Sequence, residues 1–451
     1  MLGLDSRTVS SLARFTFYLD RLRADQRGNV AIMAGLLMVP LIGAMALAFE
    51  VSNWYMTKRA MQNAADAAVL AAATNGAANY AAEAKAVTAQ YGFVDGSNNV
   101  TVTVSNAAAC PGGGNTCFSV TITDLVPLYL SQVVGFPGDA TLNSVSAKSL
   151  TSTAVATQAQ IPVNYCLLAL ATSGTGIRTN GAPKANMTGC DVMSDSAATC
   201  NGGNLLAAIG AAHNTNNGCG IQQYSNVASV SDPYSSRASN IPTNTCNLSD
   251  YSWEPASKKG IPLASSNQWS GAQSLNGNVV VCGDLQLTGD VTINASSGAV
   301  VVIENGQLDT NGYTLSTANG SALTVVFSGD NSGSYTHAPT GGGTLDFAAP
   351  TSGPWAGVAI YQDPKITSGV DISAAGNSPT WDITGLVYLP NADVTFNGAV
   401  NKSSYGQSCF VMVVNKVLID GTASILETGG CDAAGLPMPT NTVPSRAQLV
   451  L

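Results

Sequence analysis

The chain has 451 residues, and its 18 basic and 27 acidic residues make up only 10% of it. Soluble domains usually carry about 25% charged residues, so Ser, Thr, Asn and Gly must supply most of the polar surface here. The net charge of −9 leaves no basic stripe to neutralise phosphates, and we expect no nucleic-acid partner. The hydrophobic share of 45% is ordinary and excludes a protein that crosses a membrane many times.

The first 27 residues form a basic tail. They contain five Arg and three Asp, a balance of +2, whereas the rest of the chain has a balance of −11. An excess of Arg before a membrane span is typical of a cytoplasmic segment. We therefore predict a cytoplasmic tail over residues 1–27.

An uncharged run of 22 residues follows, from 28 to 49. As a helix it would be about 33 Å long, enough to cross a bilayer core. A secretory signal peptide cleaved near Ala48 is one alternative, but its apolar region should be only about 7–15 residues long. A buried core helix is another, which the Arg residues on one side disfavour. We predict a single transmembrane helix at 28–49, in which Pro40 is tolerable, with the chain after Glu50 outside the cytoplasm.

Residues 50–150 are predicted to form a long helix and a small antiparallel sheet, a pilin-like plan. Small residues recur at helical spacing until Asn75, and a second helical stripe stops at Gly92. The small face could pack within this chain or form a seam with another molecule, and the sequence leaves both open. Alternating runs at 100–104, 118–122 and 142–147 predict the strands.

All ten cysteines come after the predicted span. An even set in an exported segment predicts disulfides. Cys110 and Cys117 flank a Gly-rich hairpin tip and are the pair that we expect, whereas the connectivity of the others stays open. A zinc site is disfavoured because there is no C-x-x-C motif and there are only two His. The disulfide candidates are Cys110, Cys117, Cys166, Cys190, Cys200, Cys219, Cys246, Cys282, Cys409 and Cys431.

The remainder of the chain is predicted to be mainly β. A Ser, Thr and Ala stretch at 151–163 indicates a linker, and 436–451 a C-terminal tail. Between them, 164–435 contains short apolar runs separated by Gly and Asn turns, without a helical stretch. This pattern favours a right-handed parallel β-helix, a Cys-containing solenoid, with a β-sandwich as the alternative. The clearest runs are 279–281, 285–287, 291–293, 300–303, 323–327, 358–360, 385–389 and 410–414.

Four features of the N-terminal segment occur together in a specific order. They are the stretch QRGNVAIM from Gln26, Pro40 within the apolar run, an acidic residue at its end, and MQNAADAAVLAAA from Met61. This order of about 50 residues resembles the TadE/TadG-like proteins of Flp (tight-adherence) pilus assembly. The resemblance identifies the anchor motif as Arg27, Gly28, Pro40, Glu50 and Asp66.

Two features depart from the family pattern. Glu50 stands where the family usually has Asp. Residues 29–34 lack the acid that follows the Gly of processed pilins, so we expect no cleavage after Gly28 and a retained anchor.

Motifs across 160–430 are similar to the domain that often follows a TadG-type anchor. Other TadG-like proteins carry a von Willebrand factor A domain, whose metal site needs D-x-S-x-S. The nearest approach, Asp371-Ile-Ser-Ala-Ala375, lacks the second Ser, so we expect the TadG type without that domain. The motifs start at Cys166, Gly189, Asp232, Ala349 and Thr384.

An enzyme on this scaffold would need clustered acids or a basic catalytic group. Residues 271–430 contain no Arg, and Lys365, Lys402 and Lys416 stand apart. The acids of this region mostly border turns, which explains them without catalysis. We therefore expect no catalytic residues, no metal and no cofactor.

These observations predict a single-pass, membrane-anchored component of Flp pilus assembly. Its bulk would lie in the periplasm or cell envelope and contact pilus subunits or other Tad proteins, with homo-oligomerisation left open. The alternative is a surface adhesin or carbohydrate-binding β-helix protein that uses the same anchor. A degenerate β-helix enzyme is a third hypothesis.

Overall fold

The computed structural model describes residues 28–75, 79–111, 117–181, 191–201, 203–254, 262–374, 380–397, 409–421 and 436–450. The chain divides into two compact units. Unit 1 contains Met1–Ala159 and Pro444–Leu451, and unit 2 contains Gln160–Val443. The predicted cytoplasmic tail, with Arg27, lies outside the described residues.

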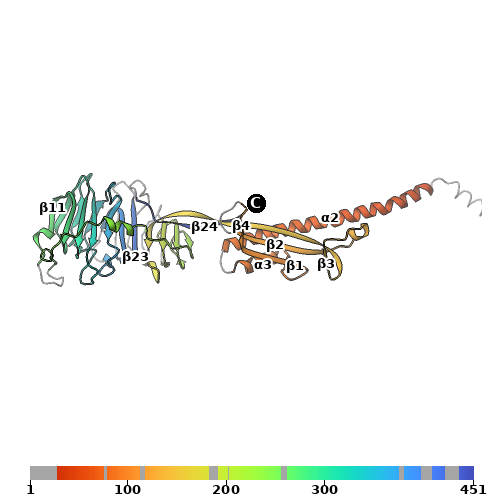
Figure 1. The fold of residues 1–451 in the computed structure, drawn as a ribbon, viewed down its shortest axis with the longest axis horizontal. Coiled ribbons are helices and arrows are strands. Elements are labelled where there is room, and N and C mark those ends of the chain that lie inside the picture. The colour runs from red at the N-terminus through yellow and green to blue at the C-terminus, as the bar shows by residue number, and fades with distance from the viewer. Residues whose placement is uncertain are drawn as a thin grey trace, which may run out of the picture. The chain divides into compact units, whose positions relative to one another are not determined.

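Unit 1 is built on one long helix, α2 (Gly28–Asn75), which runs through Pro40 without interruption (Figure 1). It ends at Asn75, where the spacing of its small residues also stops, and α3 (Tyr80–Gln90) follows. The first half of α2 exposes its large apolar side chains, for example Val39 at 74%. The second half buries a small-residue face that contains Met61, Ala64, Ala65, Ala68, Val69, Ala72 and Ala73.

An antiparallel sheet covers that buried face. Its strand β2 pairs with β1 on one side and with β4 on the other, and β3 and β24 also pair with β4. Val102, Val120 and Ala154 supply core side chains that pack with the helix. A short 3₁₀ helix, η1 (Ser131–Val134), lies between β2 and β3. The strands are β1 (Val100–Ala108), β2 (Cys117–Pro127), β3 (Ala140–Leu142), β4 (Val145–Ala169) and β24 (Thr440–Leu449).

Two segments differ from the sequence expectation. The expected linker at 151–163 lies inside β4, and most of the expected tail at 436–451 is strand β24. In β4, exposed Thr151 and Thr153 alternate with buried Ser152 and Ala154. This two-residue period is typical of a half-buried strand, and the small polar composition concealed it. Both strands continue across the boundary between the two units.

The predicted mainly β fold is confirmed for unit 2, and its strands pair in parallel. One ladder has the spatial order β12, β14, β17, β20, β22, β23, β4, β6, β8, β10. Its strands not yet given are β6 (Asp191–Ser194), β8 (Ile209–Ala212), β10 (Gln222–Tyr224), β12 (Gly277–Cys282), β14 (Ala299–Glu304), β17 (Leu323–Ser328), β20 (Val358–Gln362), β22 (Thr380–Asn397) and β23 (Phe410–Gly421).

Further parallel ladders flank the first. One runs from β11 through β13 to β15 and β16, then to β18 and β19; β19 pairs with the start of β22. Another joins β21 to the end of β22, then β23, β5, β7 and β9. These strands are β5 (Thr175–Gly181), β7 (Ala197–Cys200), β9 (Asn216–Asn217), β11 (Gln268–Ser274), β13 (Leu285–Asn294), β15 (Leu308–Asp309), β16 (Thr314–Thr317), β18 (Pro339–Thr340), β19 (Thr344–Ala348) and β21 (Ile372–Ala374).

The order of strands in the stack is not their order in the chain. The chain enters the stack in the middle with β4 and builds β6, β8 and β10 on one side. It then resumes at the far end with β11 and β12 and returns strand by strand to β23. There β23 pairs with β4 through Met412 and Leu167, and with β5 through Val417 and Ile177. The stack thus has two half-stacks, one formed by β4 to β10 and the other by β11 to β23. Residues distant in sequence join them.

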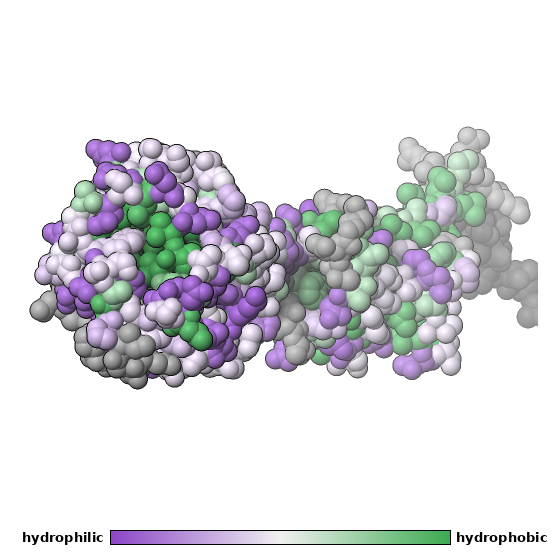
Figure 2. Space-filling view, turned by 60° about the vertical axis from the view of Figure 1, so that its left-hand side comes forward, coloured by the Kyte–Doolittle hydropathy of each residue, from purple (hydrophilic) through white to green (hydrophobic). Residues whose placement is uncertain are grey.

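Consecutive apolar residues in the central strands are explained by burial on both faces. In β14, Val301 and Ile303 belong to one hydrophobic core, whereas Val300 and Val302 belong to a second. Strands covered on both sides read as continuous hydrophobic runs. On the face of unit 2 shown in Figure 2, purple and white residues surround an apolar area near the middle.

The second core lies beneath the segment 227–241, which is tied to the ladder by tyrosines. Tyr361 Oη donates to the carbonyl of Tyr234 (3.1 Å), and Tyr388 Oη donates to Asp232 Oδ2 (2.6 Å). The Tyr361 and Tyr388 rings stack with centroids 4.6 Å apart. The segment 227–241, which contains no strand, thereby covers one face of the ladder.

Candidate functional site

The candidate site is centred on Glu50, the first charged residue of α2. Its side chain is only 6% exposed. Glu50 Oε1 accepts a hydrogen bond from the backbone N–H of Tyr129 (2.8 Å), and Oε2 accepts one from the N–H of Ser131 (2.6 Å). A buried carboxylate is costly unless it is hydrogen-bonded, and here both oxygens have donors. Glu50 therefore fastens the loop before η1 to the helix.

A second contact holds the same loop four residues further along α2. The rings of Trp54 and Phe136 have centroids 5.9 Å apart. Around this contact the loop leaves apolar side chains exposed, with Tyr129 at 76%, Leu130 at 39% and Phe136 at 37%. Tyr55 and Met56 are exposed on the helix at the same level. We call these five residues the loop collar.

Asp66 lies away from the loop collar, on the part of α2 that packs on the sheet. Gln62 Nε2 donates to Asp66 Oδ1 (2.8 Å) and also to the carbonyl of Thr153 on β4 (3.3 Å). The structure therefore does not bring Glu50 and Asp66 into one site. Gly28 is the first residue of α2, and Pro40 lies in its exposed apolar half. The small face packs against this chain's own sheet.

In three disulfides, both cysteines belong to the described residues. Cys110 and Cys117, the pair expected from the sequence, are bonded, as are Cys200 with Cys219 and Cys246 with Cys282. Cys166 and Cys409 are also disulfide-bonded. Cys190 and Cys431 lie outside the described residues.

The acids of unit 2 serve mainly as structural acceptors. Asp284 accepts backbone N–H groups from Glu254 and Gln307, at 3.1 and 3.2 Å. Asp346 and Asp382 are exceptions to the expectation that the acids of residues 271–430 border turns, because they are paired neighbours within β19 and β22. Within the described part of the chain, no group of three or more His, Cys, Asp or Glu residues could hold a metal.

Two glutamates of unit 2, half-buried Glu254 and buried Glu304, have raised pKa values. Burial, followed by the neighbouring Asp309 and Asp284, raises the pKa of Glu254 to about 8. Burial, followed by the charges of Asp363 and Asp330, raises the pKa of Glu304 to about 7. These shifts favour the neutral acid in the folded protein.

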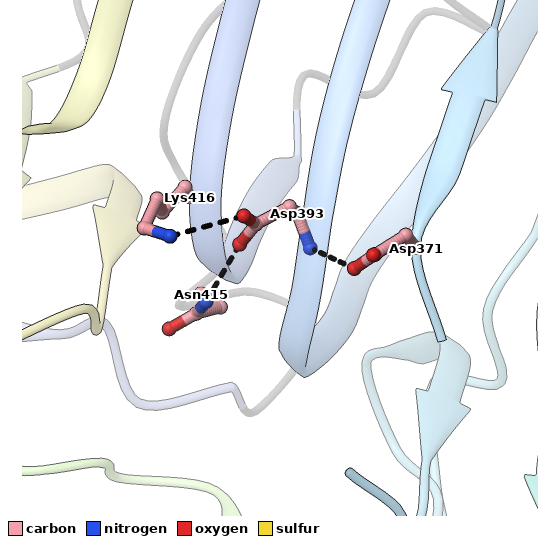
Figure 3. Close-up of polar contacts among 4 residues, drawn as sticks. All are labelled: Asp371, Asp393, Asn415 and Lys416. Atoms are coloured by element: carbon pink, nitrogen blue, oxygen red, sulfur yellow. Dashed lines mark hydrogen bonds and ion pairs between the residues drawn. The ribbon is translucent and has the colours of Figure 1, made fainter. Parts of the chain in front are cut away.

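A partly exposed network near the joint between the half-stacks links β22 and β23 with Asp371, the residue just before β21 (Figure 3). Asp393 on β22 accepts hydrogen bonds from Asn415 (2.6 Å) and from Lys416 on β23 (3.0 Å), while its own N–H donates to Asp371 (2.9 Å). Lys416 thus has a local structural role. Because both ionic side chains are substantially exposed, the pair contributes at most about 1 kcal/mol.

Sequence reasoning found Glu50 but not its partners. Tyr129 and Ser131 lie about eighty residues further along the chain and offer backbone groups, which leave no residue-type signature. The available signal was the run 125–138, LVPLYLSQVVGFPG, which lacks any charged residue between Asp124 and Asp139.

Together, the fold and the site define a protein with one candidate membrane-spanning helix, a small α+β unit on its continuation and a large β-rich unit. Of the described helices, the one within Ile32–Thr74 is long and apolar enough to cross a membrane. Residues 28–78 match the family model described as putative Flp pilus-assembly TadE/G-like, so the chain carries a TadE/G-like domain. The resemblance predicted from the sequence is confirmed.

A second family model, a domain of unknown function (DUF7305), matches residues 229–421. The match begins after β10 and ends with β23, so it covers the half-stack from β11 to β23 and the segment 227–241 except its first two residues. No curated protein and no solved structure matches the chain.

Proposed function

We propose that this protein is a single-pass, membrane-anchored component of Flp pilus assembly with a structural or interaction role. The observation that carries the proposal is the coincidence of the TadE/G-like match, residues 28–78, with α2. The exposed apolar half of that helix suits a membrane, and its second half supports the small sheet. We propose a non-catalytic role because Glu50, Asp284 and Asp393 each already accept two hydrogen bonds that hold neighbouring segments of the chain together.

The proposal includes an orientation. Residues 1–27 would lie in the cytoplasm, residues 28–49 would span the membrane uncleaved, and the β-rich unit would lie in the periplasm or cell envelope. The Arg excess of the tail and the disulfides of both units support this orientation. Alkaline phosphatase fused after the last residue should be active, whereas an inactive fusion would contradict the orientation.

The fold of unit 2 is proposed to be a right-handed parallel β-helix. The flanking parallel ladders and their shared inner core support stacked coils. Such a solenoid would present an extended polar surface to pilus subunits or to other Tad proteins.

Gene deletion with complementation tests the function. In a piliated strain that makes this protein, deletion should reduce pili per cell at least tenfold by electron microscopy. The full chain should restore them, and so should Leu248→Arg, a change at an exposed site. Val39→Arg should not, because Arg at the centre of a span costs roughly 3 kcal/mol of insertion energy.

Unchanged pilus number after deletion would contradict the proposal. If pili were normal but the cells lost binding to a glycan, the adhesin alternative would be favoured. Loss of a polysaccharide-degrading activity would instead favour the third hypothesis, an enzyme.

A further inference from the structure

The loop between β2 and β3 carries an apolar surface that continues the apolar surface of α2. Residues 125–138 contain no charge, and the loop exposes Tyr129, Leu130 and Phe136. The core of unit 1 is formed by the small face of α2 and the sheet. The exposed apolar side chains of the loop are not part of that core, so the fold of unit 1 does not account for them. Contiguous exposed apolar patches mark interaction surfaces.

Glu50 fixes the height of this loop along the helix. Its two hydrogen bonds hold Tyr129 and Ser131, and the Trp54–Phe136 contact holds the other end of η1 one turn later. Glu50 also directly follows the uncharged run 28–49. The loop is therefore positioned at the point where the predicted span ends.

The same hydrogen bonds hold Glu50 in a buried position, so its charge does not interrupt the apolar surface. Between Gly28 and Lys58 the helix carries a single charged residue, Glu50, and the loop covers it. Those residues extend about 45 Å as a helix, whereas a hydrocarbon core is about 30 Å thick. With residues 28–49 in the hydrocarbon core, the excess length with Trp54, Tyr55 and Met56 would reach the headgroup region, where Trp and Tyr are enriched.

We propose that the loop collar is a membrane-interface contact, in which Tyr129, Leu130 and Phe136 insert into the leaflet at the Glu50 end of the span. The partner is the lipid bilayer, because the surface is continuous with the span, uncharged and rich in aromatic residues. This inference rests on the membrane placement of α2 in the proposed function. It adds a second point of attachment that resists tilting of unit 1 relative to the membrane.

Depth-dependent fluorescence quenching tests the proposal on the full chain in phosphatidylcholine vesicles. Three variants each add one Trp: Tyr129→Trp in the loop collar, Ile42→Trp in the span, and Tyr313→Trp at an exposed site of unit 2. Ile42 lies about 12 Å along the helix from Glu50. The emission added by each Trp is compared in vesicles containing lipids brominated at shallow or deep acyl positions.

We expect shallow bromines to reduce the emission added by Tyr129→Trp at least twofold, and deep bromines to reduce it less. Ile42→Trp should be quenched most by deep bromines, and Tyr313→Trp by neither. If Tyr129→Trp behaves like Tyr313→Trp while Ile42→Trp is quenched, the collar proposal is overturned and the span stands. If Ile42→Trp is also unquenched, both fail. Phe136→Trp gives the same readout should Tyr129→Trp not fold.

Discussion

Glu304 is the last residue of β14 and is only 2% exposed. The two strands that pair with β14, β12 and β17, contain no basic residue that could neutralise it. Burial and the charges of Asp363 and Asp330 raise its pKa to about 7. Asp330 is itself held by Asn305, which accepts its N–H (2.6 Å) and donates to its carboxylate (3.2 Å). The folded protein therefore binds a proton at pH 6 that the unfolded chain releases.

This difference predicts that unit 2 loses stability as pH rises. The contribution of Glu304 is fully present below its ordinary pKa of 4.5 and is lost as pH rises through about 7. Between pH 5 and pH 8, the unfolding free energy should decrease by on the order of 3 kcal/mol less in Glu304→Gln than in the wild type, because Gln does not ionise. Urea unfolding of the full chain in detergent, followed by Trp fluorescence, measures it.

Glu83→Gln on α3 is the matched control and should leave the slope unchanged. If the unfolding free energies of the wild type and of Glu304→Gln changed equally with pH, a group other than Glu304 would be responsible for the pH dependence.

Individual residues also mark how far the sequence could be interpreted. Glu50 is recognisable as the acid that ends an uncharged run. Its structural use requires the backbone N–H groups of Tyr129 and Ser131, and a backbone group is the same for every residue type except Pro. Similarly, the Ser and Thr residues of β4 suggested flexibility by composition, whereas their two-residue alternation was the informative feature.

At the scale of elements, the small face of α2 determines how closely helix and sheet can approach. Ala65, Ala68 and Ala72 have no exposed surface and pack with β-strand residues of the same chain. A side chain larger than Ala has no room there without displacing the sheet.

Ala68→Leu should therefore destabilise unit 1 by about 1–3 kcal/mol. Ala60→Leu, the same change at an exposed position of the same helix, should cost less than about 0.5 kcal/mol. Hydrogen exchange of β2 and β4 in the full chain would detect the difference, since only Ala68→Leu should loosen those strands. Equal exchange in both variants would indicate that the sheet does not depend on this face.

The sequence predicted where the strands of unit 2 lie better than it predicted which strands pair with one another. The apolar runs from 279 to 414 all fall within strands of unit 2, because runs bounded by Gly and Asn are a local signal. The pairing of β23 with β4 and β5 is not local. Nothing in the composition of these strands distinguishes the neighbour in space from the neighbour in sequence.

For the whole molecule, the disulfides should stabilise the two units unequally. Cys246 and Cys282 are 36 residues apart and tie the segment before β11 to β12. Cys110 and Cys117 are only 7 residues apart in unit 1. In the loop-entropy model, closing these loops contributes about 4 and about 2.5 kcal/mol, respectively.

Replacing Cys246 and Cys282 with Ser should thus shift the unfolding of unit 2, whereas replacing Cys110 and Cys117 should leave that transition in place. Trp fluorescence separates the units, because four of the five Trp residues, all except Trp54, are in unit 2. If both double variants shifted this unfolding transition equally, the prediction that each disulfide stabilises only its own unit would be wrong.

The order in which the stack is built has a consequence for biosynthesis. A nascent chain presents β4 and β5, which end at Gly181, long before β23 begins at Phe410. Until β23 emerges, the parallel edge of β4 and β5 lacks its neighbour, and an unpaired edge is a template for aggregation. This ladder of unit 2 therefore cannot be completed before β23 has been synthesised, and the edge of β4 and β5 is open to aggregation during that interval.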